Sequence, residues 1–382
     1  MKHELLTAGI LTFHRADNYG ALLQTLALLH VLEDKGVNAE IIDYRCESIE
    51  KVYHYGIIPQ FRLNILAWGK QFIKNCIRVP KLNEKKKKCE GFRENLLKMS
   101  SSVKTRYDRE NSERKYDLIF TGSDQIWNPR ITRGKDDWYA FKREAKEGPI
   151  ITSYAASVGN LGYFEEYFKL YVCDLNQYDL ISVRESSTET FLKRKLVIPV
   201  YHVLDPTLLV SAEWWNKITP PCNVKPGTYV FYYDVDFNST CEKIAKKVAQ
   251  INHLKIVHFN IRLIWHNNMI YAESSGPEEF LSYIKNAACV VTSSFHATVF
   301  SVLFDKFLFA VPHPKTGSRI IDLLKDLGLE DRVYKQFIDT DNWTIKPVCN
   351  KAAIDQLNRL RGASLAYLDQ CIKMAIKRNA EK

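Results

Sequence analysis

The chain has 382 residues, 46% of them hydrophobic and 26% charged, and this length and composition are typical of a globular protein with two hydrophobic cores. It contains no run of roughly 18 apolar residues, which excludes a membrane-spanning helix, and its first residues predict a strand instead of a signal peptide. The formal net charge of +10 calls for an acidic partner: nucleic acid, an anionic membrane or a phosphorylated substrate. Because no recognition helix or aromatic RNA-binding motif accompanies the charge, nucleic acid is the weakest of these three.

The nine cysteines are scattered and form no CxxC pair and no Cys/His ligand spacing. Such usage argues against a disulfide framework and against a zinc site, and it favours a reducing compartment. We therefore expect a cytoplasmic protein without a bound metal.

The N-terminal residues predict a βαβ unit. A strand over Leu5–Phe13 precedes a helix that begins near Ala21 and stops at Gly36, and a second strand follows over Val37–Tyr44. In such units ligands bind at the loop between the first strand and the helix. The loop has no GxGxxG fingerprint, so a dinucleotide is not indicated. The candidate binding residues in this loop are Asn18, Tyr19 and Gly20.

Residues 47–115 predict a basic, partly helical insertion on the surface of the first domain. Aromatic and basic residues alternate along it, and it carries the lysine run Lys85–Lys88. Most runs of this kind are solvated helix faces. An amphipathic basic insertion can instead rest on an anionic membrane, and both interpretations stay open.

Four further strands follow the insertion, and each carries polar or charged residues at its carboxyl end. The predicted strands are Asp117–Phe120, Ile150–Tyr154, Leu180–Val183 and Val200–Leu204. Parallel strands place their carboxyl ends at one edge of the sheet, where ligands bind. The repeated pattern therefore predicts a site at this edge. The candidate site residues among them are Ser123, Asp124, Ser157 and Arg184, and Asp205 is noted only as the end of the last of these strands.

A second α/β series begins at Tyr229 and ends in a long helical pattern. The predicted fold is α/β, with two Rossmann-like domains that face a central cleft in a GT-B-like arrangement. The predicted domains are residues 1–207 with the insertion near 47–115, residues 208–350 as the donor-binding domain, and residues 351–382 as a closing helix.

The stretch Ala287–Lys315 combines two strand-like runs with residues suited to an anion. Ser293 and Ser294 end the first run and precede a helix, and His296 stands just inside that helix. A helix N-terminus offers unpaired N–H groups and a partial positive charge. Lys315 follows the second run, so a histidine and a lysine are expected at adjacent strand ends.

Arg184, His296 and Lys315 are therefore the expected centre of the site. Arginine and lysine bind phosphate or carboxylate, and histidine transfers a proton near neutral pH. No carboxylate pair has metal-ligand spacing. Asp124 is either a base toward a substrate hydroxyl or a helix cap. The tryptophans at 127, 138 and 265 either stack on a sugar or, more commonly for such residues, pack in the core.

The chain resembles the polysaccharide pyruvyl transferase family over most of its length. The resemblance rests on six segments in order: FHRADNYGALLQTLAL, GSDQIWNP, SYAASVG, ISVRESST, VLDPTLL and SSFHATVFSVLF. It implies transfer of a pyruvyl group from phosphoenolpyruvate to a sugar as a ketal. It also implies that Arg184, His296 and Lys315 line the phosphoenolpyruvate site, with His296 as general acid, and that no separate cofactor is needed.

One segment departs from the family pattern. Many members have Arg-Leu-His where this chain has Ser294, Phe295 and His296. The phosphate contact of that arginine must then come from Arg15, Lys315 or Arg319.

The resemblance also implies a lipid-linked saccharide acceptor of capsule or exopolysaccharide synthesis. The enzyme would meet it at the cytoplasmic face of the membrane, where the basic insertion is expected to make peripheral contact.

Two other functions stay open on the residues. A GT-B glycosyltransferase of polysaccharide biosynthesis would bind a nucleotide sugar, with Glu278 or Glu279 on the ribose. A saccharide- or membrane-binding protein would have kept the fold and lost activity.

Overall fold

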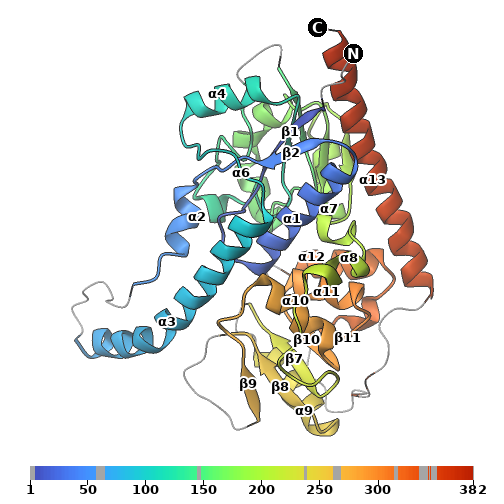
Figure 1. Ribbon diagram of the computed structural model, residues 1–382. Coiled ribbons are helices and arrows are strands. Elements are labelled where there is room, and N and C mark those ends of the chain that lie inside the picture. The colour runs from blue at the N-terminus through green and yellow to red at the C-terminus, as the bar shows by residue number, and fades with distance from the viewer. Residues whose placement is uncertain are drawn as a thin grey trace.

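The computed structural model describes residues 5–56, 65–143, 148–235, 239–260, 268–313, 317–334, 343, 345 and 351–381. These residues form two α/β units, one above the other in Figure 1, and a long C-terminal helix runs along the upper one. The predicted α/β class with two Rossmann-like units is confirmed by the parallel sheets described next.

The first unit is built on a parallel sheet in the order β2-β1-β3-β4. These strands are β1 (Thr7–Leu11), β2 (Asn38–Ile41), β3 (Leu118–Thr121) and β4 (Ile150–Ser153). Two more parallel strands, β5 (Ile181–Val183) and β6 (Val200–His202), extend the same layer through bridges from Thr152 to Leu180 and from Ala156 to Val183. The carboxyl ends of all six strands consequently meet at one edge.

Seven helices accompany this sheet in the part of the unit that the structure describes. They are α1 (Tyr19–Asp34), α2 (Glu47–Val52), α3 (Ile65–Leu96), α4 (Arg106–Lys115), α5 (Pro129–Thr132), α6 (Leu161–Leu175) and α7 (Ser186–Lys193). Helix α1 is buried on nearly every face because it packs on both units, and its N-cap Asn18 accepts a hydrogen bond from Ala21 N–H. The site lies at this end of α1.

The second unit holds a parallel sheet in the order β11-β10-β7-β8-β9. The strands are β7 (Tyr229–Tyr233), β8 (Lys255–His258), β9 (Met269–Tyr271), β10 (Cys289–Thr292) and β11 (Phe307–Ala310). The helices are α8 (Ala212–Ile218), α9 (Ser239–Ile251), α10 (Pro277–Asn286), α11 (Phe295–Leu303) and α12 (Ser318–Asp326), with short 3₁₀ turns at Pro206–Leu208 and Glu330–Arg332.

The closing helix α13 (Lys351–Ala380) packs against the first unit (Figure 1). Its Tyr367 hydroxyl donates to the carbonyl of Ser153 at 2.8 Å, and its Ser364 hydroxyl accepts from Leu204 N–H at 2.9 Å. The chain thus leaves the second unit and returns to the first. The domain limits at 207 and 350 stay a prediction.

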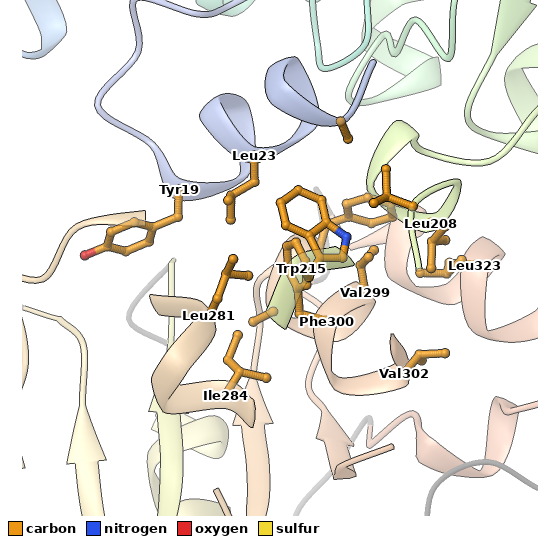
Figure 2. Close-up of a cluster of buried hydrophobic side chains, with 14 of the residues drawn as sticks. Tyr19, Leu23, Leu208, Trp215, Leu281, Ile284, Val299, Phe300, Val302 and Leu323 are labelled. Atoms are coloured by element: carbon orange, nitrogen blue, oxygen red, sulfur yellow. The ribbon is translucent and has the colours of Figure 1, made fainter. Parts of the chain in front are cut away.

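An apolar cluster joins the two units (Figure 2). Tyr19 and Leu23 on α1 face Leu281 on α10, and the Trp215 indole on α8 meets the Phe300 ring edge-on with 5.1 Å between centroids. Trp215 is fully buried. Each side chain of this size contributes about 1.5–3 kcal/mol when buried, so the cluster stabilises the contact between the two units.

The lysine run Lys85–Lys88 is not a simple solvated face, because three lysines of α3 reach across to residues of the interface. Lys81 pairs with Glu273, and Lys88 pairs with Glu279 at 2.8 Å. The Lys85 ammonium lies 3.9 Å from the centre of the Tyr19 ring, and burial lowers its pKa. Lys81 and Lys88 therefore link α3 to the second unit, and Lys85 links it to α1.

Candidate active site

A cavity of about 340 Å³ lies between the two units, at the carboxyl ends of their strands. The N-termini of α1 and α11 both reach it. Its polar side carries His296, Arg319 and Asp124, and its apolar side includes Ile49 and Val52 of α2. The predicted site and this cavity coincide in the loop after β1, the loop after β3 and the start of α11.

The His296 imidazole is held between the backbone of α1 and a buried carboxylate. A Cβ built on Gly20 would lie only 1.8 Å from His296 Nδ1, so the ring occupies the space that any other residue at position 20 would fill. On the opposite edge, His296 Nε2 lies 3.5 Å from Asp205 Oδ2. The side chain is 8% exposed, so one part of the ring still faces the cavity.

Asp205 is the buried carboxylate that links the centre of the site. Its Oδ2 accepts from Arg184 Nη1 at 2.6 Å, and its Oδ1 accepts from the Thr207 hydroxyl at 2.6 Å. Burial alone would raise the pKa of this carboxyl, but His296 and Arg184 outweigh burial and hold the pKa well below its usual range. Asp205 is therefore ionised and forms the anionic support beneath His296.

Arg184 lies behind the cavity wall, beneath the ring of Phe295. Its guanidinium carbon is 4.3 Å from the centre of that ring, and only 3% of the side chain is exposed. Besides Asp205 it contacts Glu185 at 3.4 Å. Its Nη2 is buried without a hydrogen-bond partner among the described residues and lies 3.9 Å from Asp124 Oδ1. One donor of Arg184 thus remains directed toward the Asp124 side of the site.

The four predicted serines have two different placements. The hydroxyls of Ser123 and Ser157 are fully buried and donate to the Ala155 carbonyl at 3.1 Å and to Glu185 at 2.7 Å. Burial raises the pKa of the Glu185 carboxyl. Ser293 and Ser294 line the cavity: the first donates to Asp234 at 2.8 Å, and the second caps α11.

The loop residues Asn18 and Tyr19 also differ. Asn18 lines the cavity as the N-cap of α1. Tyr19 instead is not part of the cavity wall: it stacks on Phe280 with 4.6 Å between centroids and donates to the Ser275 carbonyl. Asp124 lines the cavity with a left-handed backbone, φ 69°, and its Oδ1 accepts from the N–H of the next residue.

Three residues were proposed to replace the arginine of the family's Arg-Leu-His segment, and the structure places them differently. Arg15 is turned away and makes two 2.6 Å hydrogen bonds to Asp43. Arg319, from α12, lines the cavity with its guanidinium carbon 5.8 Å from the Phe295 ring centre. Lys315 lies outside the described residues. Arg319 is thus the arginine that the described structure places on the cavity wall.

Two features weighed in the sequence have structural explanations. Glu279 accepts from Gly276 N–H at 2.6 Å as part of a capping box and also pairs with Lys88, so both its oxygens are engaged. Trp127 and Trp138 are buried in the core of the first unit, and Trp265 lies outside the described residues.

The arrangement can bind a small anion and move a proton. Two helix N-termini and one arginine supply positive potential, and His296 beside Asp205 supplies a group that exchanges protons. Within the described ranges no group of three or more His, Cys, Asp or Glu residues could hold a metal ion, and no described helix meets the length and hydropathy needed to cross a membrane.

The comparisons with known proteins identify one family. The family model for polysaccharide pyruvyl transferase matches residues 18–312, which is more than half of the chain. A search of curated proteins gives no match. The matched segment includes Asn18, Arg184, Asp205 and His296 and ends before Arg319.

Solved structures resemble the chain only at low identity. A putative UDP-N-acetylglucosamine 2-epimerase from Listeria monocytogenes has 9% identity and a TM-score of 0.49, with 97% of this chain and 91% of that chain covered. The glycosyltransferase SnogD from Streptomyces nogalater has 10% identity and a TM-score of 0.46, with 98% and 100% covered. The MnaA–UDP structure from S. aureus has 10% identity and a TM-score of 0.47, with 87% and 84% covered. Likenesses this weak carry no conclusion about function.

Proposed function

The chain belongs to the polysaccharide pyruvyl transferase family, and we propose that it transfers a pyruvyl group from phosphoenolpyruvate to a sugar of a cell-surface polysaccharide precursor. The product is a cyclic ketal, and phosphate is released. The observation that supports this most is the placement of His296, fixed between Gly20 and ionised Asp205 in a cavity where two helix N-termini meet.

The cavity suits a small substrate with two anionic groups. The N-terminal N–H groups of α1 and α11 attract phosphate and carboxylate, and Arg319 takes the phosphate contact that the family's missing arginine would make. The volume of the cavity, about 340 Å³, lies at the lower end of the range for ligand pockets, roughly 300–1,000 Å³. A three-carbon donor and one sugar ring are compatible with that size.

We assign the proton transfer to His296, and the steps are as follows. A sugar hydroxyl adds to C2 of the enol while protonated His296 delivers a proton to the methylene carbon C3, which becomes the methyl group. A second hydroxyl of the same sugar then attacks C2, and the C2–O bond to phosphate breaks. One hydroxyl proton restores His296, and the other leaves with the phosphate.

The remaining residues position this chemistry. Asp205 stabilises the imidazolium, and Arg184 holds Asp205 in place. Asp124 faces the cavity from the first unit and is the group we assign as base toward the acceptor hydroxyl. The predicted Lys315 would add a further cation to the donor site.

Phosphate release from phosphoenolpyruvate tests the proposal. The protein is mixed with phosphoenolpyruvate and a panel of p-nitrophenyl glycosides, and both phosphate and the mass of the modified sugar are measured. We expect release with at least one sugar, and a loss of about 10²–10⁴-fold in His296→Gln.

A matched control is His30→Gln, because His30 is a half-buried histidine of α1. It should keep full activity. Equal phosphate release in His296→Gln with its melting temperature unchanged would contradict the role of His296. No phosphate release with any sugar would contradict the reaction.

We further propose that the acceptor is lipid-linked and that the protein meets it at the cytoplasmic face of an anionic membrane. The support is the outer part of α3, which projects from the first unit in Figure 1 and carries the stacked pair Trp68 and Phe72 beside exposed Ile73 and Lys74. Apolar and basic side chains together favour an anionic interface.

Co-sedimentation with phosphatidylglycerol vesicles measures this contact. Binding should weaken with salt and fall in Ile73→Asp, whereas Ile354→Asp, on the exposed side of α13, should bind as the unsubstituted protein does. Absence of binding at low salt would rule out the membrane contact and leave the reaction untouched.

A further inference from the structure

A second cavity, of about 410 Å³, lies beside the first one in the first unit. Tyr53, the residue that follows α2, lines both cavities and separates them. The other walls come from the loop after β1 and from α3, through Asp17, Lys86 and Arg93. The second cavity is therefore positioned to hold whatever extends beyond the first one on the side of α2.

Charged residues line the second cavity, and its arginines are already paired. Arg93 is 2% exposed and donates to Asp17 at 2.7 Å and to Glu90 at 2.7 Å. Arg45 pairs with Glu50, and Arg15 is held by Asp43. A phosphate would have to break such a pair to bind one of these arginines. A hydroxyl group both donates and accepts hydrogen bonds, so it can bind beside these arginines and carboxylates while their ion pairs stay intact.

Asp17, a residue of the cavity wall, carries a buried acceptor without a donor among the described residues. Asp17 is only 3% exposed, and its Oδ2 is buried without a hydrogen-bond partner in the described part of the chain. Burial raises the pKa of this carboxyl in spite of Arg93. Buried polar atoms in folded proteins are normally hydrogen-bonded, so an orphan of this kind beside a cavity indicates a missing donor.

Donors and an aromatic ring complete the lining. The Lys86 ammonium lies 3.4 Å from the Tyr53 carbonyl and the His54 ring is also part of the wall. Tyr53 is the aromatic residue of this lining, and an aromatic ring can pack on the C–H side of a pyranose. Carboxylate, ammonium, imidazole and aromatic ring together are the chemistry that recognises a neutral sugar.

We propose that the second cavity binds the sugar unit next to the one that receives the pyruvyl group, so that the enzyme prefers an acceptor of at least two sugars. This inference rests on the proposed function, because the first cavity must hold the reacting sugar. The two sugars would lie on either side of Tyr53, one near His296 and the other near Asp17 and Lys86.

The test compares a p-nitrophenyl monosaccharide with p-nitrophenyl disaccharides that share its terminal sugar. The terminal sugar is the one that gives the fastest phosphate release from phosphoenolpyruvate. We expect the KM for a disaccharide to be lower than that for the monosaccharide by about tenfold or more, because the second sugar gains at least one hydrogen bond to a charged group. In Lys86→Met and in His54→Ala this preference should shrink toward one, with the monosaccharide KM as internal reference.

Lys87→Met is the matched control, because Lys87 is exposed on the same helix and lines neither cavity. It should retain the full preference. Disaccharides that are no better than the monosaccharide, or a preference that survives in Lys86→Met and His54→Ala, would overturn this inference alone. Absence of phosphate release with every sugar would instead overturn the proposed function.

Discussion

Replacing Gly20 with alanine tests the position of the His296 ring, because the substitution suits the helix but leaves no room for the ring. Gly20 is the second residue of α1, where alanine is normally better than glycine by about 0.5–1 kcal/mol. Yet the added Cβ would lie 1.8 Å from His296 Nδ1 and 2.3 Å from its Cγ, well inside the 3.4 Å at which ordinary contacts begin. The imidazole must therefore move by more than an ångström.

The cost should appear mainly in activity. A misplacement of about 1 Å can reduce the rate of an enzyme 10²-fold, so we expect Gly20→Ala to lose at least that much in phosphoenolpyruvate-dependent phosphate release. Overpacking costs about 1–3 kcal/mol, so the melting temperature should also fall. In a His296→Ala background the clash is removed, and there Gly20→Ala should no longer destabilise the protein.

Two other helical glycines provide the control. A Cβ on Gly91 of α3 or on Gly362 of α13 meets nothing within 4 Å. Gly91→Ala and Gly362→Ala should leave activity unchanged and hold or raise the melting temperature. Normal turnover in Gly20→Ala would refute the position assigned to His296, because no ring in that position can coexist with the new methyl group.

Three further substitutions test other parts of the site. Arg319→Ala should raise the KM for phosphoenolpyruvate at least about tenfold in steady-state assays, because it removes a charged hydrogen bond to the donor; an unchanged KM would assign the phosphate contact elsewhere. Asp205→Asn should lower the free energy of unfolding by about 3 kcal/mol at pH 7, since Arg184 loses its buried partner. The pKa of Asp205 is lower in the folded state than its value of about 3.9 in the unfolded chain, so the ionised carboxylate stabilises the fold above that pH. In denaturation experiments the difference in unfolding free energy between variant and parent should therefore close as pH falls below about 3.9. A difference that stays constant with pH would contradict the ion pair. Lys88→Met should cost up to about 1 kcal/mol in thermal unfolding by breaking the half-exposed pair with Glu279, and Lys87→Met should cost nothing.

The fold was largely predictable because its strands are short apolar runs that end in polar residues. The predicted runs Tyr229–Tyr233 and Phe307–Val311 are observed as strands β7 (Tyr229–Tyr233) and β11 (Phe307–Ala310), within one residue at each end. Strand β9 (Met269–Tyr271) was not predicted, since three half-buried residues give no periodic signal. The insertion was expected to be partly helical, and its described residues include helices α2, α3 and α4. Helix α3 continues through Pro80, a residue that usually marks an end.

The site was predicted in its location more than in its contacts. His296 was expected at the start of a helix, and it is the second residue of α11 and lines the cavity. Asp205 was noted only as a strand end, although the rule that gave Arg184 also applies to it: β5 and β6 are neighbours, so the residues after them lie together. The packing of the His296 ring against Gly20 could not be predicted from the sequence, because the two residues lie on different units.

The orientation of long side chains was the least predictable feature. Nothing in the sequence distinguishes the lysines of α3 that meet Glu273, Glu279 and Tyr19 from those in solvent, because the direction depends on how α3 crosses the second unit. For the same reason Tyr19, expected at the ligand, lies in the apolar cluster instead.

The central claim is that the cavity at His296 binds phosphoenolpyruvate, and thermal stability with and without this compound tests it most directly. A ligand that binds only the folded state raises its stability by about 2.7 kcal/mol at a hundredfold excess over Kd. We predict a concentration-dependent rise in melting temperature with phosphoenolpyruvate that is lost in Arg319→Ala and absent with uridine diphosphate. A rise with uridine diphosphate alone would contradict the account and identify a nucleotide-sugar enzyme.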